Sequence, residues 1–73
     1  MNFTDTQVLA LIRQHPGLNL YRLMKRAQKD MARWPWTIGK VQHAVERLEK
    51  AGRVEKRSET EGGRACVRVY LKN

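Results

Sequence analysis

The sequence predicts a small α+β domain in which three helices are followed by a two-stranded β-hairpin. Up to about residue 51, apolar side chains recur every three or four positions, which is the spacing of helices that bury one face. After Gly52, apolar and polar side chains alternate, as they do in a half-buried strand. Gly62 and Gly63 interrupt this alternation and predict the turn of a hairpin. A chain of 73 residues has room for one such domain, which we place over residues 1–73.

The first helix is predicted over residues 4–14. Thr4 and Gln7 have the spacing of a capping box, in which each side chain satisfies a backbone N–H at the start of a helix. His15-Pro16-Gly17 ends the helix, because proline cannot continue it and glycine allows the turn that follows. The apolar stripe of this helix comprises Val8, Leu9, Leu11 and Ile12.

The second helix is predicted over residues 19–31, with Asn19 as its N-cap. Pro35 marks the break that follows, because it pushes the preceding Trp34 toward an extended conformation. The apolar stripe consists of Leu20, Leu23, Met24, Ala27 and Met31. The cationic side chains that lie off this stripe are Arg22, Lys25, Arg26 and Lys29. This helix is therefore expected to have one core face and one basic face.

The third helix is predicted over residues 37–51. Thr37 is its expected N-cap, and Gly52 stands where helices commonly end in a left-handed residue. The expected core positions are Ile38, Val41, Ala44, Val45 and Leu48. The side opposite the core carries Gln42, His43, Glu46, Arg47 and Lys50, with Lys40 at its edge. The third helix is therefore expected to present a polar face to solvent.

The hairpin is predicted over residues 53–72. Its first strand is expected to begin at Val54 and to reach Ser58, and Glu61-Gly62-Gly63 is expected to form the turn. The apolar side of the second strand consists of Ala65, Val67, Val69 and Leu71. Such a hairpin can cover the open side of a helical core that is too small to close by itself.

The charge balance points to a polyanionic partner. The chain has 15 Lys and Arg against 7 Asp and Glu, a net charge of +8 and an isoelectric point near 10.4. Residues 17–33 hold five of these cations against one Asp, so the charge is concentrated around the second helix. A basic surface that serves only solubility is the alternative interpretation.

Several function classes are excluded or disfavoured by composition. Cys66 is the single cysteine, so no internal disulfide forms, and with only His15 and His43 beside it a structural zinc site is excluded. No signal peptide and no apolar run of about 20 residues is present, so we expect a cytoplasmic, nucleoid-associated protein. No Ser/His/Asp set, paired carboxylates or glycine-rich phosphate loop is found, so we expect neither enzyme activity nor a cofactor or metal.

Residues 41–57 resemble a known family. Leu48-Glu49-Lys50-Ala51-Gly52 runs into Val54-Glu55-Lys56-Arg57, which resembles the recognition helix and first wing strand of winged helix-turn-helix transcription regulators of the PadR and MarR types. Gly62-Gly63-Arg64 is similar to the PadR wing tip, and Leu20-Tyr21-Arg22-Leu23 to the start of the second helix in these families. The resemblance implies a winged helix-turn-helix domain that binds double-stranded DNA through its third helix.

Two features depart from the PadR pattern. The sequence ends at Asn73, where PadR-type proteins usually continue into a long dimerisation helix, and Tyr70 stands without the second aromatic residue of the PadR wing. We therefore expect a monomer or a weak homodimer that pairs through the first helix or on DNA. The first 16 residues contain one Arg and one Asp, so two copies can approach there without net repulsion.

The candidate DNA-binding residues fall into three sets. Recognition helices read base edges in the major groove, where Gln pairs with adenine and Arg with guanine, whereas phosphate contacts position the protein. The residues expected at base edges and in the groove are Thr37, Lys40, Gln42, His43 and Arg47. The residues expected at phosphates are Arg22, Lys25, Arg26, Lys29, Arg33 and Lys50. The residues expected to flank the hairpin tip, and there to follow the backbone or enter a minor groove, are Arg57 and Arg64.

The sequence is also compatible with two other functions. Trp34-Pro35-Trp36 is a candidate docking surface within a larger protein assembly, because contiguous exposed apolar surface marks partner sites. The same tryptophans suit a role in anchoring their loop to the core, since large aromatic side chains dominate small cores. The third function is binding to RNA or to an unusual duplex, whose shape the third helix would read.

Overall fold

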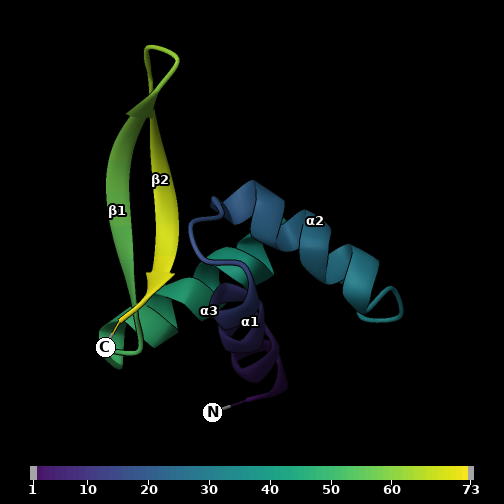
Figure 1. The fold of residues 1–73 in the computed structure, drawn as a ribbon. Coiled ribbons are helices and arrows are strands. Elements are labelled where there is room, and N and C mark those ends of the chain that lie inside the picture. The colour runs from purple at the N-terminus through teal and green to yellow at the C-terminus, as the bar shows by residue number, and fades with distance from the viewer. Residues whose placement is uncertain (1, 73) are drawn as a thin grey trace.

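The computed structural model describes residues 2–72, so Met1 and Asn73, the two ends of the predicted domain, lie outside the described part. Over residues 2–72 the chain forms three helices and a two-stranded antiparallel sheet, the α+β class that the sequence predicts. The elements are α1 (Phe3–Gln14), α2 (Leu20–Asp30), α3 (Ile38–Lys50), β1 (Val54–Glu61) and β2 (Arg64–Leu71). Figure 1 shows the hairpin standing beside the helices, with its turn projecting well beyond them.

Each helix begins at a side chain that accepts a hydrogen bond from the backbone N–H three residues later. Asn19 caps α2 and Thr37 caps α3, as predicted. The predicted cap of α1 is wrong by two residues, because Asn2 and not Thr4 is the cap. The Oδ1 of Asn2 accepts from the backbone N–H of Asp5 at 2.8 Å, which places Thr4 inside the first turn.

The core lies between the helices and the base of the hairpin. Its buried apolar side chains are Val8, Leu9, Leu11, Ile12, Leu23, Ala27, Trp36, Val41, Ala44, Val45, Leu48, Val54 and Val69. Fully burying an aliphatic side chain of this kind contributes about 1.5–3 kcal/mol, so the helices and the hairpin depend on one another. Leu20, Met24 and Met31 are half-buried and pack against this cluster. The predicted core role of Ile38 is wrong: 44% of Ile38 is exposed, while Trp36, two residues earlier, is buried.

A two-residue turn joins the strands. Glu61 pairs with Arg64, so Gly62 and Gly63 are the only residues between the strands. Their φ angles are 58° and 79°, the left-handed pair that a type I′ hairpin turn requires. The first strand therefore continues to Glu61, whereas the sequence pattern predicts an end near Ser58.

The edge of β2 that does not face β1 is hydrogen-bonded to the α1–α2 connection. The backbone N–H of Gly17 donates to the carbonyl of Val69 at 3.0 Å, and the N–H of Val69 donates to the carbonyl of Leu18 at 3.0 Å. Gly17 has a φ of 86°, and a Cβ there would lie 3.4 Å from the ring of Tyr70. The wing is thus fastened to the helices by backbone pairing as well as by apolar packing.

The apolar side of the hairpin is buried only near its base. Val69 is buried and Leu71 is half-buried, whereas Val67 is 41% exposed and Ala65 is exposed as well. The alternation predicts the strand correctly but not the depth of each side chain, because the outer half of the hairpin extends past the helices (Figure 1). Within residues 2–72, no helix combines the length and the apolar character that crossing a membrane requires.

Candidate nucleic-acid interface

The outward face of α3 is polar and uncovered by the rest of the described fold. Val41, Ala44, Val45 and Leu48 are buried on the opposite face, and this is why the side chains between them point to solvent. The exposed side chains on the outward face are Gln42, His43, Glu46 and Lys50. Nε2 of Gln42 donates to Oε1 of Glu46 at 3.4 Å, so these two side chains are neighbours one turn apart. Hydrogen-bonding groups thus stand along this face.

The first turn of α3 lies beside an aromatic pair. Thr37 uses its hydroxyl to cap the helix, where Oγ1 accepts from the backbone N–H of Lys40 at 3.2 Å. The Nζ of Lys40 lies 5.7 Å from the ring centroid of Trp34, and the ring of Trp34 lies 4.9 Å from that of Phe3. Trp34 is 37% exposed whereas Trp36 is buried, so only the latter anchors the loop in the core.

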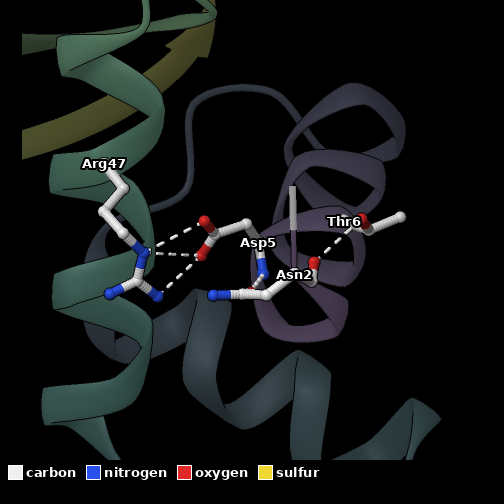
Figure 2. Close-up of polar contacts among 4 residues, drawn as sticks. All are labelled: Asn2, Asp5, Thr6 and Arg47. Atoms are coloured by element: carbon white, nitrogen blue, oxygen red, sulfur yellow. Dashed lines mark hydrogen bonds and ion pairs between the residues drawn. The ribbon is translucent and has the colours of Figure 1, made fainter.

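Arg47 is the candidate whose surroundings differ most from expectation. Its Nε lies 3.1 and 3.0 Å from the two carboxylate oxygens of Asp5, and its Nη2 lies 2.7 Å from Oδ1 (Figure 2). These hydrogen bonds raise the pKa of the Arg47 guanidinium above its usual value. Asp5 is 6% exposed, a buried carboxylate that sequence reasoning missed. The two residues are 42 positions apart, and no sequence pattern connects them.

The cations of α2 line a groove. It has a volume of about 360 Å³ and is lined by Leu18, Arg22, Lys25, Arg26 and Lys29, which we call the α2 groove. Within residues 2–72 none of these four cations forms an ion pair with a carboxylate. The Nζ of Lys25 lies 5.9 Å from the ring of Tyr21, an exposed aromatic side chain at the start of the helix. The structure therefore brings the predicted phosphate-binding residues of α2 together.

The remaining predicted phosphate-binding cations lie elsewhere. Arg33 is exposed in the α2–α3 connection, outside the α2 groove. Lys50, the last residue of α3, is exposed. Neither contributes to the cluster on α2.

The wing carries its three arginines on the face that also holds its carboxylates. Nη2 of Arg57 lies 2.7 Å from Oε1 of Glu55, and its guanidinium carbon lies 4.4 Å from the ring centroid of Tyr70. Hydrogen bonding to Glu55 raises the pKa of Arg57. Arg57 pairs across the sheet with Arg68, in the middle of the hairpin, so the expectation that it flanks the tip is wrong. Arg64 is exposed and directly follows the turn, as expected.

Arg68 links the wing to the body of the protein. Its Nε lies 3.0 Å from Oε2 of Glu59, its Nη2 contacts Glu61, and its Nη1 donates to the carbonyl of Gly17 at 3.0 Å. The hydroxyl of Tyr70 donates to Oε1 of Glu59 at 3.0 Å, and this bond, with partial burial, raises the pKa of Tyr70. Sequence reasoning did not single out Arg68, because the residue directly opposite it is Arg57, and Glu59 lies diagonally across the hairpin.

The described part of the chain contains no cluster of three His, Cys, Asp or Glu side chains arranged to hold a metal ion. Its chemistry lies in hydrogen-bonding side chains on α3 and in guanidinium and ammonium groups on α2 and the wing.

Helix α2, the connection that follows it, and α3 form a helix-turn-helix, and the hairpin is its wing, so the fold is a winged helix-turn-helix. Among solved structures, the chain is similar to SSV1 F-93, with a TM-score of 0.74 and 25% sequence identity; the match covers 99% of this chain and 72% of that chain. The chain matches no protein-family model and no curated protein.

Proposed function

We propose that the protein binds double-stranded DNA and acts as a sequence-specific transcription regulator. The observation that carries the proposal is the uncovered polar face of α3. The helix before it in the chain, α2, carries cations that have no carboxylate partners within residues 2–72. In helix-turn-helix proteins the second helix of the pair lies in the major groove while the first crosses the backbone. α3 and α2 occupy these two positions in the chain.

The chemistry of the α3 face suits base edges. The major groove is about 12 Å wide and admits a helix, and Gln can form two hydrogen bonds with adenine. Gln42 and His43 are exposed in the N-terminal half of α3, the half that meets bases in this class of protein. The exposed Ile38, in the first turn, adds an apolar side chain suited to a thymine methyl group.

The chemistry of α2 and the wing suits the sugar–phosphate backbone. The cations of the α2 groove would contact phosphates, and Arg64 would do so at the wing tip. The sequence resemblance to PadR and MarR regulators supports a regulatory role. We also propose that the protein works without enzyme activity or cofactor, in the cytoplasm with the nucleoid, as a monomer or weak homodimer that pairs on DNA.

A salt titration tests the proposal. Affinity is measured against duplex DNA, duplex RNA and single-stranded DNA of the same sequence, over a range of salt concentrations. If about five phosphates are contacted, log affinity for duplex DNA falls with log salt with a slope of about −4 to −5. Tighter binding to duplex RNA or to the single strand would contradict the proposal.

Specificity is tested by Gln42→Ala on a selected site and on scrambled duplex. Losing a bidentate base contact lowers affinity for the selected site by roughly 1–3 kcal/mol and leaves scrambled DNA nearly unchanged. Lys50→Ala on the same helix is the control, because loss of a phosphate contact weakens both complexes in parallel. An unchanged ratio of the two affinities in Gln42→Ala would show that Gln42 does not read a base.

One observation favours a second function, docking to another protein. Phe3 and Trp34 form a partly exposed aromatic pair, although the burial of Trp36 makes this surface smaller than the sequence suggests. Trp34→Ala separates the two functions, since a docking residue can be removed without loss of DNA affinity.

A further inference from the structure

We propose that Asp5 is a positioning residue for DNA binding, which holds Arg47 so that the free end of its guanidinium meets an acceptor pair on DNA. The acceptors are the oxygens of a phosphate or the O6 and N7 of guanine, which present the same chemistry to Arg. This inference rests on the DNA-binding function proposed above and assigns it a residue on α1, outside the helix-turn-helix.

The backbone that carries the carboxylate of Asp5 is held in place. Asp5 lies in the first turn of α1, where its backbone N–H donates to Oδ1 of Asn2 at 2.8 Å (Figure 2). The hydroxyl of Thr6 donates to the carbonyl of Asn2 at 2.9 Å, so Asn2 accepts a hydrogen bond through its side chain and another through its backbone. A carboxylate in the first turn also interacts favourably with the helix dipole. Asp5 is therefore a buried acceptor on a fixed turn of backbone.

Arg47 is bound along one edge only. Asp5 engages its Nε and Nη2, and Arg carries five N–H donors in a rigid plane. Within residues 2–72 its Nη1 donates to no group, and the side chain is 49% exposed. Figure 2 shows one terminal nitrogen directed toward Asp5 and the other away from it. The Nη1–Nη2 end therefore faces outward on a side chain whose rotation is already restricted.

Restriction matters because a free arginine loses rotamer freedom when it binds. A guanidinium that is already oriented loses less, so more of its interaction energy is expressed as affinity and as selectivity for geometry. The simpler alternative is a tether that only joins α1 to α3. An ion pair with one half-exposed partner is weak evidence for stability, and a carboxylate near a polyanion opposes binding by its charge.

The sign of the charge effect provides the test. Asp5→Asn and Asp30→Asn each remove one negative charge from a chain of net charge +8. Asp30 is exposed at the end of α2 and forms no ion pair within residues 2–72, so it is the matched control. If only charge matters, both variants bind duplex DNA slightly more tightly. If Asp5 positions Arg47, Asp30→Asn binds slightly more tightly while Asp5→Asn loses roughly 5- to 150-fold on the preferred duplex.

A double-mutant cycle identifies the route of the effect. Asp5→Asn combined with Arg47→Ala should bind no more weakly than Arg47→Ala alone, because Asp5 acts only through Arg47. The same variants on scrambled duplex distinguish the two acceptors: a loss confined to the preferred site indicates guanine, and an equal loss on both indicates phosphate. Circular dichroism melts set a temperature at which every variant is folded.

A measurement on the unmutated protein keeps the test independent of folding. In nuclear magnetic resonance spectra, the Nε–H of Arg47 should exchange slowly in free and bound protein, while its Nη resonances shift only with DNA. Loss of Nε–H protection in the complex, or Asp5→Asn binding as tightly as Asp30→Asn, would overturn the proposal. Failure of the wild-type protein to bind any duplex would instead overturn the proposed function.

Discussion

Helix α2 and the wing carry the same number of cations and use them differently. Each holds four Lys or Arg side chains. The four on α2 have no carboxylate partners within residues 2–72, and they line one groove. On the wing, Lys56 pairs with Glu49 of α3, Arg57 with Glu55, and Arg68 with two glutamates, which leaves Arg64 at the tip. The same number of cations therefore leaves α2 with unpaired positive charge that can attract a polyanion, whereas in the wing most of it is used in ion pairs within the protein.

The difference follows from backbone geometry and composition. Asp30 is the acid of α2 and lies at its last residue, so the basic face meets no opposite charge. In the hairpin, residues directly or diagonally opposite one another have neighbouring Cβ atoms, and β1 contributes Glu55, Glu59 and Glu61 to the face that holds the arginines. On this face Glu55 pairs with Arg57 of the same strand, and Glu59 and Glu61 pair with Arg68 of the other, so the wing neutralises most of its own charge.

The largest expected effect comes from reversing charge in the α2 groove. Lys25→Glu combined with Arg26→Glu should weaken binding to all duplex sequences alike, by about 100-fold or more at about 0.1 M salt, because each lost phosphate contact removes about one counterion. The slope of log affinity against log salt should become shallower by about two. Arg13→Glu, on α1, lowers the net charge by two instead of four and is the control for a charge reversal outside the α2 groove. An unchanged slope would remove α2 from the interface.

A smaller effect is expected at the wing tip. Arg64→Ala should lower affinity for selected and scrambled duplex in parallel, by about eight-fold at about 0.1 M salt, with a slope shallower by about one. Arg57→Ala, which removes a cation already paired with Glu55, should leave the slope nearly unchanged. If both variants changed the slope equally, paired and unpaired wing cations would not differ in function.

Arg68 should affect the wing without affecting the salt dependence of binding. Arg68→Ala removes the contacts to Glu59, Glu61 and the carbonyl of Gly17. We expect faster amide hydrogen exchange in β1 and β2, a lower melting temperature, and an unchanged slope of log affinity against log salt. A shallower slope would mean that Arg68 contacts phosphate and that the self-neutralised wing is a wrong description.

The smallest expected effect is a rise in the pKa of the Tyr70 hydroxyl. The neutral hydroxyl of Tyr70 donates to Glu59 in the folded state, so its folded pKa lies above the ordinary value of about 10. The stabilisation from this group is fully present below the unfolded pKa and is lost as pH rises through the folded pKa. Tyr21→Phe leaves Tyr70 as the single tyrosine, and in this variant tyrosinate absorbance should therefore appear at a higher pH than in free tyrosine. Glu59→Gln should bring the midpoint back toward the ordinary value, and a midpoint already at that value in the parent would contradict the bond.

Much of the fold could be predicted because its signals are local. The caps at Asn19 and Thr37, the left-handed Gly52 and the turn at Gly62-Gly63 depend on the residue and its immediate neighbours. The candidate site was predicted less completely. Clustering of the α2 cations follows from helical spacing, whereas the pairing of Arg47 with Asp5 depends on how α1 packs against α3.

By itself the sequence determined the order and type of the elements, because hydrophobic period, capping and turn chemistry are properties of short segments. Only the tertiary structure decided how deeply each side chain is buried and which charged side chains pair. It exposed Ile38 and buried Trp36, exposed Val67 and buried Val69, and engaged Arg47 and Arg57 with carboxylates. Burial and ion pairing depend on which segments distant in the chain lie against each other, and a period of 2 or 3.6 specifies a face but not what covers it.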